Sequence, residues 1–175
     1  MSLNDEILAL FENWYALEMP RLYRYVMYHV RDQAAAEELT AAICEEALRY
    51  LHRYEPRQGG LNCWMVGIAR NKLKEFYRAQ ARRPASVPLD SLPNLHARGQ
   101  SPEHAVETIE VFRQAVRGLR ELPEQEQEVV ALRYGAELTN QEIAELLGLN
   151  PNHVGVLLHR ALKKLRQTMQ AEERG

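Results

Sequence analysis

Basic side chains gather in two stretches of this 175-residue sequence, and the chemistry that they suit is the binding of nucleic-acid phosphates. Between Asn150 and Gln167 there are four Lys and Arg residues and no Asp or Glu. Between Arg70 and Arg83 there are six Lys and Arg residues against the single Glu75. The net charge of the whole chain is −2, which hides both stretches. Clustered cations of this kind are typical of proteins that bind nucleic acids.

A helix-turn-helix is predicted around the C-terminal basic stretch. Thr139 and Glu142 have the spacing of a capping box, which marks the start of a helix. That helix stops at Gly148, a residue suited to the left-handed position after a helix end. Asn150 and Pro151 then restart a helix, as N-cap and first helical residue. Two short helices joined by a tight turn that contains glycine favour a helix-turn-helix.

The second of these helices has one apolar and one polar face when it is plotted at about 100° per residue. The apolar face holds Val154, Leu157, Leu158, Ala161, Leu162, Leu165 and Met169. The polar face holds the predicted DNA-binding residues Asn152, His153, Val156, His159, Arg160, Lys163 and Lys164. Such a helix can lie in a major groove, with its first residues at base edges and its later cations at phosphates. Val156 suits either contact with a thymine methyl or simple exposure as an isolated valine. For the polar face as a whole, the alternative to DNA binding is a basic surface that contacts only solvent.

The other basic stretch belongs to a helix predicted over residues 62–82, where aromatic side chains alternate with cations. Its buried side should hold Met65, Ile68, Ala69, Leu73 and Phe76. Cations and aromatics together suit unpaired bases, because rings stack on base faces while cations follow the backbone. Trp64 and Tyr77 fit either that role or the core of the domain.

A helix predicted over residues 33–53, with Asp32 as its N-cap, is acidic instead. Ala36, Leu39, Ile43, Ala47 and Tyr50 can face inward. The exposed side then carries Glu38, Ala41, Ala42, Glu45 and Arg49, and Glu37 and Glu46 extend its acidity. A face of carboxylates and small residues suits a basic protein surface, with simple solvation as the alternative.

Metal and nucleophilic chemistry find no support in the sequence. The six histidines show no metal-ligand spacing, and Cys44 and Cys63 fit small core residues better than nucleophiles. Gly59 and Gly60 lack the spacing of a phosphate-binding loop. We therefore expect no enzymatic activity, no metal and no cofactor.

The composition is ordinary for a globular protein, with 46% hydrophobic and 26% charged residues. No apolar run approaches the roughly 20 residues that a membrane span requires, and the acidic start lacks the features of a signal peptide. Two cysteines are too few for a disulfide framework. These features predict a cytoplasmic protein.

Two helical domains and a flexible linker are predicted. Residues 84–102 hold four prolines and three serines without a helical apolar period, which indicates a linker, or else an ordered loop. Before it, helices are expected near 4–18, 20–31, 33–53 and 62–82. After it, they are expected near 103–120, 123–134, 139–147 and 151–169. The domains are thus residues 1–83 and 103–175, each small enough for a partner surface to complete its core.

These segments together resemble the bacterial RNA polymerase sigma factors of the sigma-70 family, specifically the small extracytoplasmic-function group. The matching stretches are Ala36–Leu39, the tryptophan motif Trp64–Asn71, Leu122–Glu124, Asn140–Gly148 and His159–Arg166. A helix-turn-helix alone is common among regulators, whereas its combination with the tryptophan motif is specific.

The resemblance implies a non-catalytic initiation subunit whose partners are core RNA polymerase and promoter DNA, and possibly an anti-sigma factor. Its first domain would bind polymerase through Glu37, Glu38, Leu39 and Glu45. Asn62, Trp64, Arg70, Asn71, Lys74 and Arg78 would lie at the −10 element, and the predicted DNA-binding residues of the last helix would lie at the −35 element. The sequence departs from the family pattern at Ala41 and Ala42, where Gln and an acid are usual. The alternative function is therefore a helix-turn-helix regulator without productive polymerase contact.

Overall fold

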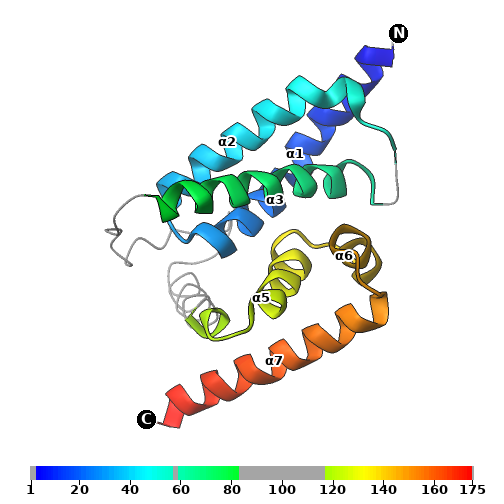
Figure 1. Ribbon diagram of the computed structural model, residues 1–175. Helices are drawn as coiled ribbons and strands as arrows, with labels where there is room; N and C mark the ends of the chain where they lie inside the picture. Colours follow the sequence, from blue (N-terminus) through cyan, green and yellow to red (C-terminus); the bar gives the residue numbers. More distant parts are fainter. Residues whose placement is uncertain (1–2, 57–58, 83–116, 175) are drawn as a thin grey trace, which may run out of the picture.

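The computed structural model describes residues 3–56, 59–82 and 117–174, and every regular element in these ranges is a helix (Figure 1). The N-terminal elements are α1 (Leu3–Val30), α2 (Gln33–Tyr50), the short 3₁₀ helix η1 (Leu51–Arg53) and α3 (Gly60–Ala81). The C-terminal elements are α5 (Glu124–Val130), the π-helical turn η2 (Ala131–Gly135), α6 (Asn140–Leu147) and α7 (Pro151–Arg174). The predicted all-α fold is confirmed. The predicted linker and most of the helix expected near 103–120 lie outside the described residues, although residues 117–120 are helical.

The prediction that α1 would be two helices divided at Pro20 is wrong, because α1 runs unbroken from Leu3 to Val30. A proline inside a helix removes one hydrogen bond and costs roughly 3 kcal/mol. Tertiary packing offsets this cost, since Trp14 is buried on one side of Pro20 and Leu22 and Val26 on the other. Pro20 itself is exposed, so its ring does not disturb the core.

Helix α2 begins as predicted, with the Asp32 side chain accepting a hydrogen bond from the Ala35 amide at 2.7 Å. Ala36, Ile43 and Ala47 are fully buried, as the periodicity predicts. Tyr50 was expected to face inward, but it is 37% exposed. The backbone tightens into η1 directly after Tyr50, and this change of winding turns Leu51 into the core instead.

The C-terminal unit is built around α7, which packs against α5 and α6. Val129, Leu132, Ile143 and Val154 are buried where these helices meet. On α7 the predicted apolar face is confirmed: Val154, Leu157, Leu158 and Ala161 are buried, and Leu162, Leu165 and Met169 are partly buried. The opposite side of the helix therefore faces solvent.

The two units are in contact with each other, as Figure 1 shows for α1 and α3 above α5 and α6. The π-helical turn η2 packs on α1, and α6 packs on α3. Gly135 permits the closest approach: a Cβ atom there would lie 2.9 Å from the Tyr25 Cα. Each small unit thus covers part of the other's surface.

Candidate nucleic-acid interface

Helices α6 and α7 form the helix-turn-helix, and the capping predicted from the sequence is confirmed at each step. The Glu142 amide donates to the Thr139 hydroxyl at 3.2 Å, and the Thr139 amide donates to the Glu142 carboxylate at 2.7 Å. Gly148 has φ of 66°, the left-handed conformation that a tight turn needs. The Asn150 side chain then accepts from the Asn152 amide at 2.8 Å and caps α7.

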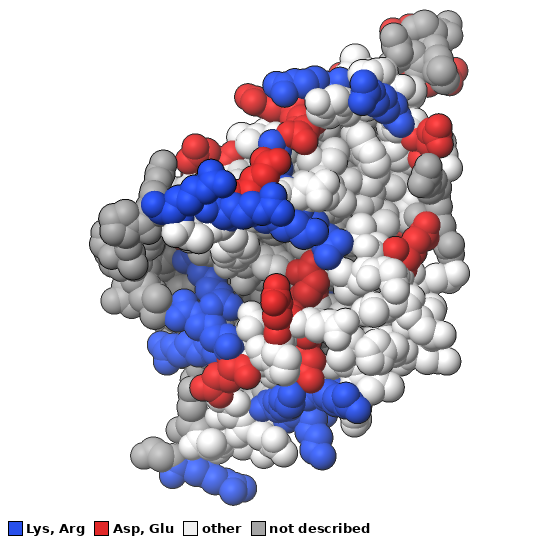
Figure 2. All heavy atoms as spheres, viewed as in Figure 1, with Lys and Arg blue, Asp and Glu red and all other residues white. Residues whose placement is uncertain are grey.

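The outer face of α7 is open in the described residues. Asn152, His153, Val156, His159, Arg160 and Lys163 are all exposed, and Val156 reaches 44%. Figure 2 shows Lys and Arg side chains along α7 and again over α3, with Asp and Glu side chains between the two regions. A convex helix that carries exposed cations and no acid over its first four turns can enter a DNA groove.

Lys164 differs from the other predicted DNA-binding residues of α7. Its ammonium donates to both carboxylate oxygens of Glu126 on α5, at 3.0 and 2.9 Å. Glu126 is only 5% exposed, so this ion pair anchors α7 to α5. The charge of Lys164 is therefore already balanced within the protein.

The predicted −10 residues of α3 fall into two groups. Asn71, Lys74 and Arg78 are exposed to solvent. Asn62, Trp64 and Arg70 are half-buried. The second group is where the C-terminal unit touches α3.

Hydrogen bonds hold Asn62 and Arg70 in this interface between the units. The Asn62 amide nitrogen donates to the Ala136 carbonyl, and its oxygen accepts from the Trp14 indole, both at 3.3 Å. Arg70 donates from Nε to Glu128 at 2.9 Å and from a terminal nitrogen to the Leu146 carbonyl at 3.3 Å. The sequence did not predict these partners.

Trp64 is packed against the core of the N-terminal unit, with its ring centroid 5.4 Å from that of Tyr54. Trp64 also lines a pocket of about 600 Å³ between α3 and α6, together with Cys63, Asn71 and Leu146. Of the two roles that the sequence left open for Trp64, packing is therefore realised in this structure. Tyr77, in contrast, is 43% exposed and donates from its hydroxyl to the His29 carbonyl at 2.8 Å.

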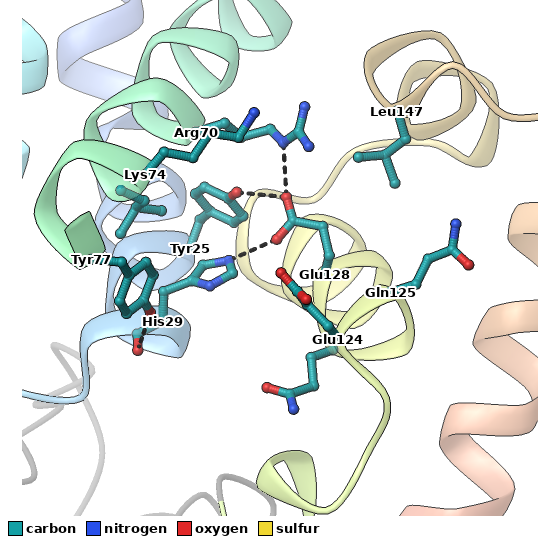
Figure 3. A pocket seen from close by; sticks show the side chains of 11 residues that line it. Tyr25, His29, Arg70, Lys74, Tyr77, Glu124, Gln125, Glu128 and Leu147 are labelled. Atoms are coloured by element: carbon teal, nitrogen blue, oxygen red, sulfur yellow. Dashed lines mark hydrogen bonds and ion pairs between the residues drawn. The ribbon is translucent and has the colours of Figure 1, made fainter. Parts of the chain in front are cut away.

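Glu128 contacts three side chains of the N-terminal unit at the junction of the two units (Figure 3). One carboxylate oxygen accepts from the Tyr25 hydroxyl and from Arg70, each at 2.9 Å, and the other lies 2.9 Å from His29 Nε2. Burial alone would raise the pKa of Glu128, but the His29, Tyr25 and Arg70 contacts outweigh it and hold this pKa below its usual value. Burial and the nearby Glu128 raise the pKa of Tyr25, so its hydroxyl keeps the proton that it donates.

No local pattern in the sequence could have identified Glu128. It lies in the run Glu124–Glu128, where acid and amide residues alternate and an exposed face is the natural prediction. Its partners are 58 to 103 residues away along the chain. Together these groups line a pocket of about 750 Å³ between α1, α3 and α5.

The acidic residues of α2 lie on a separate surface. Glu37, Glu38 and Glu45 are exposed, whereas Leu39 is partly buried against the core. Glu46 forms an ion pair with Lys72 of α3, which neutralises one end of the acidic face. Three exposed carboxylates therefore remain available to a basic partner.

Within the described ranges, no group of three or more His, Cys, Asp or Glu residues could hold a metal ion. The helices in those ranges are also too short or too polar to cross a membrane. The candidate binding surfaces are the exposed polar faces of α7, α3 and α2.

Both units are similar to known protein families. Residues 14–83 match the family model of sigma-70 region 2, and residues 112–165 match that of sigma-70 region 4. The chain is 33% identical over 132 residues to the ECF RNA polymerase sigma factor ShbA of Streptomyces griseus, covering 74% of this chain and 69% of ShbA. It is 29% identical over 155 residues to the ECF sigma factor BldN of Streptomyces coelicolor, covering 87% of this chain and 58% of BldN.

A solved structure also has this fold. The sigma factor RpoE from Bartonella quintana, solved in complex with the anti-sigma factor NepR, superposes with a TM-score of 0.70. The similarity covers 91% of this chain and 96% of RpoE, at 17% sequence identity. At that identity the likeness concerns the fold alone.

Proposed function

Because the chain belongs to the extracytoplasmic-function group of the sigma-70 family, we propose that it binds core RNA polymerase and directs transcription from promoters with its own −10 and −35 elements. The observation that carries this proposal is the presence in one chain of both the tryptophan-bearing helix α3 and a helix-turn-helix with an open basic face. It acts as a binding subunit and not as a catalyst, in the cytoplasm, where bacterial polymerase works.

The C-terminal unit, which we place at residues 103–175, reads the −35 element in duplex form through α7. Asn152, His153 and Val156 lie in the first turns of α7, where a recognition helix contacts base edges. Arg160 and Lys163 lie farther along the same face and suit phosphates. Lys164 anchors α7 to α5 through its ion pair with Glu126, so it is less available to DNA than Lys163.

The N-terminal unit, residues 1–83, provides the −10 and polymerase surfaces. Asn71, Lys74 and Arg78 are exposed along α3 and suit the backbone of a melted strand. The same strand is also contacted by Arg70, Asn62 and Trp64 once the C-terminal unit moves away from α3. Glu37, Glu38 and Glu45 on α2 suit a basic surface of the polymerase.

An anti-sigma factor is the third partner that we propose. The relative RpoE was solved bound to the anti-sigma factor NepR, and the fold of this chain matches RpoE over most of its length. A protein that covered the exposed faces of α7 and α2 would keep this chain from promoter DNA and from polymerase.

A transcriptional regulator without polymerase contact is the second candidate function. Ala41 is exposed and Ala42 is half-buried on the acidic side of α2, and neither offers the polar group usual in the family. This weakens the complementarity of α2 to a basic partner without affecting α7.

Pull-down with purified core polymerase, followed by run-off transcription from promoters recovered by sequencing the DNA bound in cells, tests the proposal. We expect co-purification and promoter-dependent transcripts. Binding to duplex promoter DNA with no polymerase association establishes the regulator instead.

A further inference from the structure

Val156 is an apolar side chain on the outer face of α7, and α7 lies on the side of the C-terminal unit away from α1 and α3 (Figure 1). Val156 is 44% exposed. In the part of the chain that the structure describes, it belongs neither to the hydrophobic core nor to the partly buried side chains packed on that core. Packing within the protein therefore does not account for a valine at this position.

The position of Val156 around the helix is central on this outer face. Val154, Leu157 and Ala161 are buried and define the inner side of α7. At about 100° per residue, the middle of the opposite side is occupied by Asn152, Val156, His159 and Lys163. Val156 thus lies in the middle of the surface that would meet a DNA groove, and not at its edge.

The first two turns of α7 contain no Lys or Arg residue, and Arg160 is the first of either type in this helix. Bidentate contact of Arg or Lys with O6 and N7 is the commonest way in which proteins read guanine. Asn152 instead suits adenine, because an amide can bind N6 and N7 together. Its side chain makes no hydrogen bond with the described residues, since Asn150 caps the helix. The base-reading turns therefore carry side chains that suit A·T pairs.

Thymine offers an apolar partner for Val156. Among the four bases, only thymine presents a methyl group in the major groove. Contact between this methyl group and a valine removes apolar surface of both from water. Over cytosine, the same valine would displace water from the N4 amino group without replacing its hydrogen bond, which costs affinity. Gly155, the preceding residue, has no side chain that could hold α7 away from the base.

We propose that Val156 recognises the 5-methyl group of one thymine in the −35 element, so that this A·T pair is selected by apolar contact. The inference rests on the proposed function for the placement of α7 in the major groove of the −35 element. It adds the base that the middle of α7 selects and the chemical group by which that base is recognised.

Selection of DNA duplexes with a randomised segment of about one helical turn identifies the bases that the full-length chain prefers. We expect the wild type to require a T·A pair at one position. Val156→Ala should lose the preference at that position alone, because the other reading side chains are unchanged. The control is Gln170→Ala, an exposed residue roughly 21 Å farther along α7, which should select the same sequence as the wild type.

Replacing the selected thymine by deoxyuracil removes the methyl group and keeps every hydrogen-bonding group of the base pair. We expect the affinity of the wild type, measured by fluorescence anisotropy, to fall about fourfold, the effect of one buried methyl-sized group. Val156→Ala should bind the thymine and deoxyuracil duplexes almost equally. Deoxyuracil at a thymine outside the selected segment should leave the affinity of the wild type unchanged.

The salt dependence of binding separates this contact from a phosphate contact. An apolar contact releases no counterions, so Val156→Ala should lower the affinity by the same factor at every salt concentration. A flatter salt dependence in Val156→Ala would mean that the substitution displaces phosphate-binding side chains, and it would contradict the proposal.

Equal affinity of the wild type for the thymine and deoxyuracil duplexes overturns the proposal. It is also overturned if the wild type selects no thymine, or if Val156→Ala keeps the full effect of the methyl group, since another residue would then make the contact. Failure of the chain to bind core polymerase in the pull-down would contradict the proposed function. The deoxyuracil comparison would still decide the role of Val156, because it requires only this chain and duplex DNA.

Discussion

The Lys164 ammonium donates to both oxygens of the buried Glu126 carboxylate, whereas its neighbour Lys163 is exposed on the face of α7 that we place on DNA. The two adjacent lysines therefore have different roles: Lys164 anchors α7 to α5, and Lys163 is available to DNA. The helical period of 3.6 separates adjacent side chains by about 100°, which is enough to direct the Lys164 side chain toward Glu126 of α5 and the Lys163 side chain away from it.

Replacing each of these lysines by alanine should separate stability from DNA binding. Lys164→Ala leaves Glu126 buried without its ion-pair partner, and we expect the free energy of unfolding to fall by about 1–3 kcal/mol in urea titrations. Lys163→Ala should leave unfolding unchanged and weaken binding to duplex promoter DNA. The opposite result, with stability lost in Lys163→Ala alone, would mean that the two assignments are exchanged.

Reversing the charge of Arg160 and Lys163 to Glu should weaken duplex DNA binding and flatten its salt dependence. Each phosphate contact contributes about 0.9 to the slope of log affinity against log salt concentration, so two lost contacts reduce the slope by at least about 1.8. Fluorescence anisotropy at several salt concentrations measures this. A slope equal to that of the wild type would count against α7 as the DNA face.

Replacing both Glu38 and Glu45 by Lys should weaken association with core polymerase by about tenfold or more, because two exposed carboxylates of α2 would become cations facing a basic surface. Binding to −35 duplex DNA should persist, since α7 is untouched. A matched control reverses the exposed Glu12 and Glu121 instead. If polymerase association survives in the α2 variant, the docking surface lies elsewhere.

Thr139→Ala should lower the free energy of unfolding by about 1 kcal/mol, because it removes the hydroxyl that caps α6. Glu142→Ala removes the reciprocal bond, and the double variant should cost less than the sum of the two, since each bond depends on the other. Thr168→Ala, inside α7, is the control and should change unfolding by no more than about 0.5 kcal/mol. Strict additivity of the two capping variants would argue against a coupled box.

Acid should weaken the contact between the two units at Glu128. Burial acts to raise the pKa of Glu128, but its contacts with His29, Tyr25 and Arg70 hold this pKa below the ordinary value of 4.5 while the units are packed together. A depressed pKa stabilises the packed arrangement of the units. This stabilisation is fully present above pH 4.5 and is lost as the pH falls through the lower pKa of the packed units. Lys74, Tyr77 and Glu124 are the other ionisable groups that line this pocket.

Cys63 of α3 lies beside Glu145 and Leu146 of α6, so its accessibility increases when the units separate. Modification of Cys63 with a reagent that does not require the thiolate, measured between pH 7 and pH 4, tests this expectation. Its rate should increase in the wild type below about pH 4.5, while far-UV circular dichroism confirms that the helices persist. Glu128→Gln cannot ionise and should show a smaller pH dependence. Identical pH profiles for the two proteins would exclude Glu128 as the titrating group.

The local structure of this protein follows from its amino-acid sequence alone. Asp32, the Thr139–Glu142 capping box, Gly148 and Asn150 set the starts and ends of helices through bonds that span at most a few residues. The apolar period of α7 determined which side is buried and which carries the cations. These features could be predicted because the physical cause of each lies within one helical turn.

The partners of the charged side chains of α3, α5 and α7, in contrast, depend on how the helices pack together. Arg70 meets Glu128 across 58 residues, Tyr25 meets it across 103, and Lys164 meets Glu126 across 38. The continuous passage of α1 through Pro20 and the exposure of Tyr50 have the same origin, because packing against distant helices outweighs local preference. Ion pairing and burial depend on how whole units meet, and no periodicity along the chain records that arrangement.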